Sequence, residues 1–194
     1  KIGQFFFDDD YDSQESYEDL VGKWSKLFFR VLKNDAACYV YINWKQLGPW
    51  LKALEAAGFV CKNVIVWDKV RHGLNYQNYA YTHEFIIFAV KGDFFPNNKE
   101  DYAAGFWKDV FHLHREQTGD DIDGTKHVTQ KQVGIVELPI MHGSRKGDLV
   151  LDAFGGSMTT AVAAQRLGRR YCMVEKEEKY IKMGLLRLSQ GSLL

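Results

Sequence analysis

Only three cysteines and three prolines occur among the 194 residues of the chain. Cys38, Cys61 and Cys172 stand alone in segments expected to be strands, which excludes a disulfide framework or a zinc site and indicates buried, reduced thiols. No apolar run approaches the ~20 residues that cross a bilayer. We therefore expect a protein of the reducing cytoplasm, with no bound metal and no membrane partner.

A net charge is also absent, because 25 lysine and arginine residues balance 25 aspartate and glutamate residues. The charge balance neither supports nor excludes nucleic acid as a partner, and any contact with DNA has to come from a local patch. What the chain does have is 46% hydrophobic and 14% aromatic residues. At this length they can fill the core of one ordinary domain, so we expect a single α/β domain over residues 1–194.

The most informative stretch runs from Asp148 to Glu175, where an apolar strand, a glycine turn, an alanine-rich helix and a second strand follow one another. The absence of side chains at Gly155 and Gly156 lets a ligand lie against the backbone. The free N–H groups of the following helix favour a charged ligand by ~0.3–1 kcal/mol. Glu175 ends the second strand, where a carboxylate can accept two hydrogen bonds from a ribose diol. The pattern predicts a site for an adenosine-containing ligand.

Helices and strands alternate in the rest of the chain. The expected helices cover about residues 16–32, 50–58 and 177–188, and the expected strands cover residues 36–43, 60–69 and 83–91. This alternation favours a mostly parallel sheet with helices on both faces. A mainly apolar segment, which opens with His127–Lys131 and reaches Met141, is expected to form a further helix that Pro139 should kink or end.

Two segments are too polar or too weakly periodic for the core. Residues 71–82 are expected to form an exposed loop at the rim of the sheet, and residues 92–126 a partly ordered insertion. The loop and the end of the strand before it contain basic, amide and aromatic side chains that are suited to binding phosphates and unstacked bases. They are Lys69, Arg71, His72, Asn75, Tyr76 and Tyr79. An ordinary solvated loop is the alternative interpretation.

The glycine turn, Asp152-Ala-Phe-Gly-Gly-Ser-Met-Thr-Thr160, resembles the Asp-Pro-Phe-x-Gly-Ser-Gly-Thr-Thr loop of S-adenosylmethionine-dependent DNA amino-methyltransferases. It departs at Ala153 and Met158, where the family usually has proline and glycine, and Met158 adds bulk near the expected cofactor. Three earlier blocks are similar to family segments in the same order: 29–44, 58–69 and 83–92. The resemblance covers nearly the whole chain apart from the insertion and implies a Rossmann-like methyltransferase fold with S-adenosylmethionine as cofactor.

The resemblance also implies which residues bind the cofactor. Around the turn they are Asp152, Phe154, Gly155, Gly156, Ser157, Thr159 and Glu175. The block His127-Val-Thr-Gln-Lys131 is similar to a His-Pro-Thr-Gln-Lys-Pro block that lies beside the methionine end of the cofactor in this family. Thr129 and Lys131 are expected to hold the cofactor carboxylate through charge-assisted bonds worth ~1.5–3 kcal/mol. The alternative for this block is a solvated helix N-terminus capped by Thr129.

The order of the blocks resembles the permuted β-type arrangement of the family, in which a catalytic Asp/Ser-Pro-Pro-Tyr motif lies N-terminal to the other blocks. No such motif occurs in residues 1–194. Asp8 and Tyr11 imitate its ends, but two aspartates replace the prolines between them, so these residues are weak catalytic candidates in what we interpret as a surface acidic loop. We expect the true motif upstream of Lys1, so that this polypeptide alone is inactive.

In this family a methyl group passes directly from the sulfonium to the exocyclic amine of a base flipped out of the duplex. The resemblance therefore implies a DNA methyltransferase acting on adenine N6 or cytosine N4, with double-stranded DNA as partner, a homodimer as a further option and residues 92–126 as a target-recognition segment. A role in restriction-modification is one setting for such an enzyme. The main alternative is a degenerate methyltransferase-fold binding module without activity, and a third is a methyltransferase acting on RNA or a small molecule.

Overall fold

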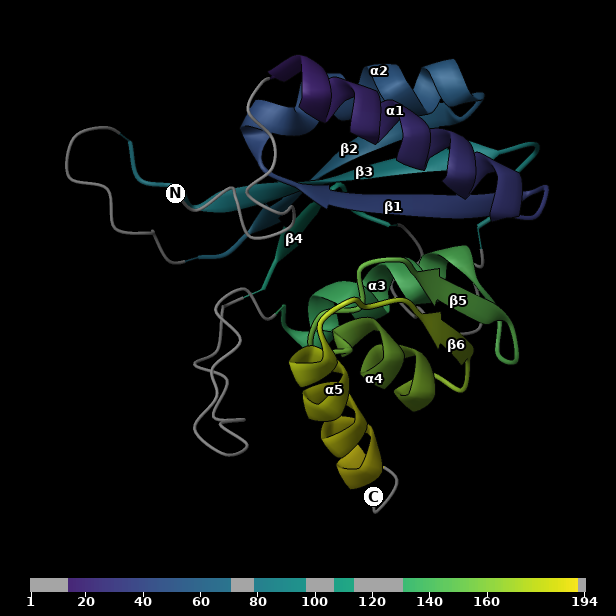
Figure 1. Cartoon of the computed structure of the whole chain (residues 1–194), viewed down its shortest axis with the longest axis vertical. Helices are drawn as coiled ribbons and strands as arrows, with labels where there is room; N and C mark the ends of the chain where they lie inside the picture. The colour runs from purple at the N-terminus through teal and green to yellow at the C-terminus, as the bar shows by residue number, and fades with distance from the viewer. Residues whose placement is uncertain (1–13, 71–78, 97–106, 114–130, 192–194) are drawn as a thin grey trace. The chain divides into compact units, whose positions relative to one another are not determined.

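The computed structural model describes residues 14–70, 79–96, 107–113 and 131–191, which fall into two compact units (Figure 1). Unit 1 comprises Lys1–Phe95 with Trp107–His114, and unit 2 comprises Pro96–Phe106 with Arg115–Leu194. The single domain expected over residues 1–194, with residues 92–126 as an insertion, stays a prediction.

The described residues of unit 1 contain a four-stranded sheet in the order β1-β3-β2-β4. Its strands are β1 (Ala36–Ile42), β2 (Val60–Asp68), β3 (His83–Lys91) and β4 (Val110–His112). β3 runs antiparallel to both β1 and β2, whereas β4 runs parallel to β2. The expectation of mostly parallel pairing is therefore corrected to a mixed sheet. The physical reason is that residues 69–82 have the composition of a loop and not of a crossover helix, so the chain returns in the opposite direction.

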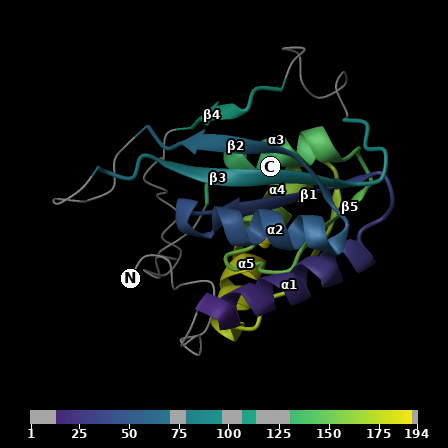
Figure 2. The same ribbon diagram turned by 90° about the horizontal axis from the view of Figure 1, so that it is seen from above.

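Two helices of unit 1, α1 (Gln14–Val31) and α2 (Leu47–Ala57), lie side by side on one face of its sheet (Figures 1 and 2). A short 3-10 helix, Trp44–Gln46, precedes α2. The core between helices and sheet contains Tyr17, Val21, Ile42, Trp50, Leu54, Phe59, Ile87 and Ala89. Gly58 ends α2 as expected, at a φ of 106° that favours glycine.

β4 lies in the segment interpreted as an insertion, and its three residues carry no periodicity that could predict it. Its place at the sheet edge is fixed by backbone and side-chain bonds to β2. The Val66 amide donates to the carbonyl oxygen of Asp109 at 2.8 Å, and Trp67 Nε1 donates to the carbonyl oxygen of Leu113 at 3.4 Å. Part of the insertion thus belongs to the sheet.

The three cysteines are free thiols. Cys38 and Cys61 pair in register with the same residue, Ala89 of β3, so they flank it on neighbouring strands. Both are partly buried, and burial raises the pKa of the Cys38 thiol to about 12. The expectation of a buried thiol is wrong for Cys172, which is exposed on a sheet that has only two strands in the described residues.

Unit 2 contains the predicted strand-turn-helix-strand sequence. Its elements are α3 (Val133–Gly143), β5 (Leu149–Asp152), α4 (Thr159–Arg166), β6 (Arg170–Met173) and α5 (Glu178–Gly191). β5 and β6 pair in parallel, with Asp152 opposite Met173. Pro139 was expected to kink or end this helix. It lies inside α3, so it does not end it, and the kink stays a prediction. Ile135, Val136 and Ile140 are buried around it, and their burial offsets the hydrogen bond that the proline cannot donate.

No helix in the described part of the chain combines the length and the apolar content that crossing a membrane requires.

Candidate cofactor site

Asp152, the last residue of β5, organises the glycine turn through both carboxylate oxygens. Oδ1 accepts the backbone N–H of Phe154 at 2.9 Å, and Oδ2 accepts the hydroxyl of Thr160 at 2.6 Å. The first bond fixes the start of the turn and the second fixes the first turn of α4. Because both bonds are made to an ionised acceptor, each is stronger than an ordinary neutral hydrogen bond. Asp152 thereby joins strand, turn and helix, and its direct contact with the cofactor stays a prediction.

Glu175, two residues after β6, lies against the same turn. Its Oε2 accepts the backbone N–H of Gly156 at 2.7 Å, and its Oε1 accepts the backbone N–H of Glu177 at 2.9 Å. Each carboxylate oxygen offers more than one lone pair, so both oxygens can accept a further hydrogen bond. The carboxylate expected to bind a ribose is thus held beside the glycines expected to lie under the ligand.

Met158 immediately precedes α4 and adopts a left-handed conformation, with φ 60° and ψ 29°. Such a conformation costs of order 1 kcal/mol or more for a residue with a side chain, which explains why a loop of this kind favours glycine here. Met158 is only 7% exposed, and its side chain packs against Gly184 of α5. The bulk expected near the cofactor is therefore accommodated inside unit 2, where Gly184 leaves the space.

Arg187 of α5 is the residue of this site that the sequence analysis missed. Arg187 is 9% exposed, and its Nη1 donates to the carbonyl oxygen of Ser157 at 2.6 Å. The same nitrogen lies 3.2 Å from the hydroxyl oxygens of Ser157 and of Thr159. A buried cation from the last helix thus holds two residues of the turn. The only sequence signal was an arginine among the leucines of an amphipathic helix.

The Lys131 backbone meets the start of α4, because its carbonyl oxygen accepts the hydroxyl of Thr159 at 3.3 Å. The end of the His127–Lys131 block therefore lies next to the glycine turn, as the interpretation of this block requires. His127 and Thr129 lie outside the described residues. The contact of this block with the cofactor carboxylate stays a prediction.

The residues predicted to contact DNA belong to unit 1. Lys69 directly follows β2, where its ammonium group forms an ion pair with Glu84 of β3 and lies 5.3 Å from the ring centroid of Trp67. Tyr79 is 98% exposed, as expected for a rim loop. The remaining candidates, Arg71, His72, Asn75 and Tyr76, lie outside the described residues, as do the weak catalytic candidates Asp8 and Tyr11.

Comparison with known proteins gives a family match over most of the chain. A family model described as DNA methylase, covering N6 and N4 methyltransferases, matches residues 2–185. The chain is 31% identical over 195 residues to the type II methyltransferase M2.LlaDCHI of Lactococcus lactis subsp. cremoris, spanning 94% of this chain and 72% of that protein. It is 31% identical over 191 residues to M2.DpnII of Streptococcus pneumoniae, spanning 92% of this chain and 71% of that protein.

Solved structures show the same fold. The M1.HpyAVI–SAM complex matches with a TM-score of 0.71 and 24% identity, over 86% of this chain and 81% of that one. The PvuII DNA methyltransferase, described as cytosine-N4-specific, matches with a TM-score of 0.79 and 16% identity, over 93% of this chain and 74% of that one. These similarities confirm the Rossmann-like methyltransferase fold expected from the sequence.

Proposed function

The chain belongs to the N6/N4 DNA methylase family, and on this premise we propose that the turn from Asp152 to Ser157, with Glu175, binds S-adenosylmethionine. Membership makes the chain an S-adenosylmethionine-dependent DNA methyltransferase that acts on an exocyclic amine. The observation that carries the proposed site is the Glu175 carboxylate held 2.7 Å from the Gly156 amide, at the carboxyl ends of β5 and β6. Ligands of open α/β sheets bind at this end of the strands.

The residues around the turn fit an adenosine. Phe154 is 39% exposed and offers an apolar ring surface for a base. Glu175 keeps acceptor capacity for two ribose hydroxyls, and the glycines leave the backbone open to close approach. The contacts with Ser157, Thr159, His127, Thr129 and Lys131 complete the proposed site, the last three at the carboxylate end.

The chemistry that the cofactor supplies is a methyl group on a sulfonium, which is electrophilic without further activation. The protein therefore has to orient two reactants and exclude water, and it needs no strong acid or base in unit 2. Arg187 and Asp152 contribute by fixing the turn, since each bonds to parts of it that are separate in sequence. A rigid turn keeps the methyl donor in one orientation.

Calorimetric titration with S-adenosylmethionine tests the proposed site. Glu175→Gln keeps an oxygen for the Gly156 amide but removes the charge, so we expect the dissociation constant to rise about tenfold or more, as for loss of a charge-assisted bond of ~1.5–3 kcal/mol. Glu177→Gln is the matched control, because Glu177 is an exposed neighbour whose side chain takes no part in the site. Unchanged affinity of the Glu175 variant would remove this residue from the site.

DNA is the partner on which the family acts, and we propose that the loop after β2 and the 92–126 segment contact it. Lys69, Arg71, His72 and Asn75 supply cationic and hydrogen-bonding groups for phosphates and bases. For Lys69 such a contact has to share the ammonium group with Glu84.

We further propose a homodimer that acts in the cytoplasm, where its DNA substrate is found. Adjacent exposed leucines on α5, Leu185 and Leu186, support an apolar surface that a second copy could cover. Sedimentation equilibrium over a range of protein concentrations tests the assembly. A monomer at every concentration would contradict the dimer.

A further inference from the structure

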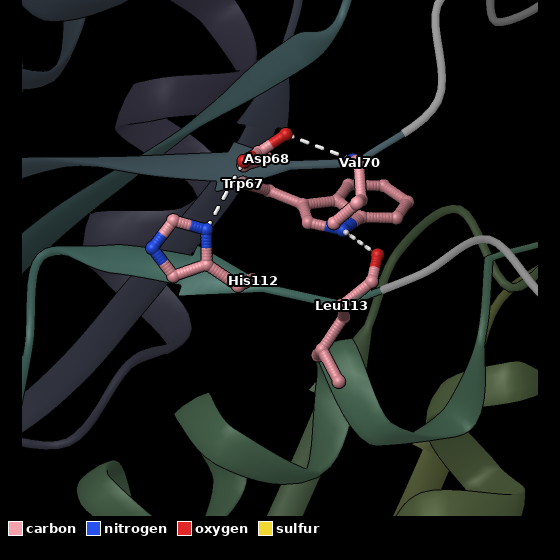
Figure 3. Close-up of polar contacts among 5 residues, drawn as sticks. All are labelled: Trp67, Asp68, Val70, His112 and Leu113. Atoms are coloured by element: carbon pink, nitrogen blue, oxygen red, sulfur yellow. Dashed lines mark hydrogen bonds and ion pairs between the residues drawn. The ribbon is translucent and has the colours of Figure 1, made fainter.

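His112, the last residue of β4, is bound to the last residue of the neighbouring parallel strand. Its Nδ1 lies 3.0 Å from Oδ2 of Asp68, while Oδ1 of Asp68 accepts the backbone N–H of Val70 at 2.8 Å (Figure 3). Val70 itself has a φ of 58°, which is unusual for a β-branched residue. One carboxylate therefore fixes both the imidazole ring and the backbone that leaves β2.

Within residues 14–70, 79–96, 107–113 and 131–191, the second ring nitrogen of His112 has no hydrogen-bond partner. Figure 3 shows Nε2 on the far side of the ring from Asp68. The His112 side chain is 68% exposed, against 35% for Asp68. A protonated imidazole is a donor at both nitrogens, so with Nδ1 engaged by the carboxylate, Nε2–H is the group available to a partner. His112 lies at the carboxyl end of β4, beside the carboxyl end of β2, with which β4 pairs in parallel.

The charged groups around the His112 imidazole hold the ring in one orientation. From β2 it faces Asp68, whose carboxyl pKa is held below its usual value by the Val70 amide and then by the His112 bond. His83 of β3 adds a smaller effect on the same carboxyl. From its own segment, Lys108 and Asp109 share an open hollow with His112. Asp68 thus stays ionised as an acceptor over the range in which histidine titrates.

We propose that His112 donates its Nε2–H to a phosphate of the DNA backbone, with Asp68 holding the ring. The inference rests on the proposed DNA contact of unit 1 and adds a residue to it. Phosphate is the ligand class because it accepts a single directed hydrogen bond from a cation and is present at every step of the duplex. The contact positions the DNA without reading its sequence.

The test is the salt dependence of duplex binding at pH 6.0. The slope of log affinity against log salt rises by about 0.9 for each phosphate that the protein neutralises, so His112→Ala should lower its magnitude by about 0.9. His112→Lys should restore it, because a cation returns to the same strand end. Lys52→Ala is the matched control, since it removes one exposed positive charge from α2 and should leave the slope unchanged.

The outcomes separate this inference from the proposed function. A wild-type slope retained in His112→Ala would overturn the contact while leaving DNA binding intact. Absence of duplex binding by the wild-type protein would overturn the proposed function first and the contact with it. An equal fall in slope in His112→Ala and Lys52→Ala would also overturn the contact, because the effect would then come from net charge.

Discussion

The packing of Met158 against α5 predicts that Gly184 tolerates a side chain only when Met158 is absent. A Cβ added at Gly184 would lie 1.9 Å from Cγ and 2.6 Å from Cβ of Met158, and neither atom is the far end of a flexible chain. Overpacking of this kind costs ~1–3 kcal/mol, whereas alanine is favoured over glycine inside a helix by ~1 kcal/mol. Gly184→Ala should therefore destabilise the protein by a net ~0–2 kcal/mol.

Met158→Gly removes both clashing atoms and suits the left-handed backbone at this position. In the Met158→Gly background, Gly184→Ala should stabilise the protein by ~0.5–1 kcal/mol, because the clash is gone and only the higher helix propensity of alanine contributes. Urea denaturation of the wild type, both single variants and the double variant gives a coupling free energy, which we expect to be ~1–3 kcal/mol. Equal effects of Gly184→Ala in the two backgrounds would refute the packing argument.

Three further predictions follow from other interactions. Burial lowers the pKa of His142 from 6.5 to about 4. The folded protein thus keeps the ring neutral while the unfolded chain takes up a proton. The free energy of unfolding should therefore decrease as pH falls from 6.5 towards 4, by no more than ~1–2 kcal/mol after allowance for the partial exposure of the ring. Urea denaturation at pH 7.5 and 4.5 measures this decrease, and His142→Leu should abolish it. Arg187→Lys keeps the charge but removes the planar guanidinium that bonds to Ser157 and Thr159, so calorimetry should show weaker S-adenosylmethionine binding. Wild-type affinity in this variant would contradict the proposal that Arg187 fixes the turn. Replacing Lys69 and Arg71 with alanine should lower the salt slope of DNA binding by about 0.9 for each phosphate that is no longer neutralised. An unchanged slope would indicate that the loop after β2 is a solvated surface without a DNA contact.

The sequence predicted those features that depend on neighbouring residues. β3 begins at His83 and ends at Lys91 as expected, and the glycine turn lies between β5 and α4 as expected. These segments carry apolar runs or glycine signals of their own, and the family resemblance fixed their order. The position of Glu175 beside the turn followed from the parallel β5–β6 pairing that such a pattern implies.

The features that the sequence could not predict depend on partners distant in the chain. β4 is three residues long and is defined by its bonds to β2. The contact of Arg187 with Ser157 and the space that Gly184 leaves for Met158 arise only when α5 packs on the turn. No local propensity encodes such interactions, because they follow from tertiary packing.

The central claim is that the protein transfers a methyl group from S-adenosylmethionine to an exocyclic amine of DNA. The direct measurement incubates the full-length protein with duplex DNA and a cofactor labelled in its methyl group, digests the DNA to nucleosides and identifies the labelled one. We predict label in N6-methyladenine or N4-methylcytosine. Label on a ring carbon such as that of 5-methylcytosine, or a protein that binds cofactor and DNA yet labels neither amine, would contradict the account.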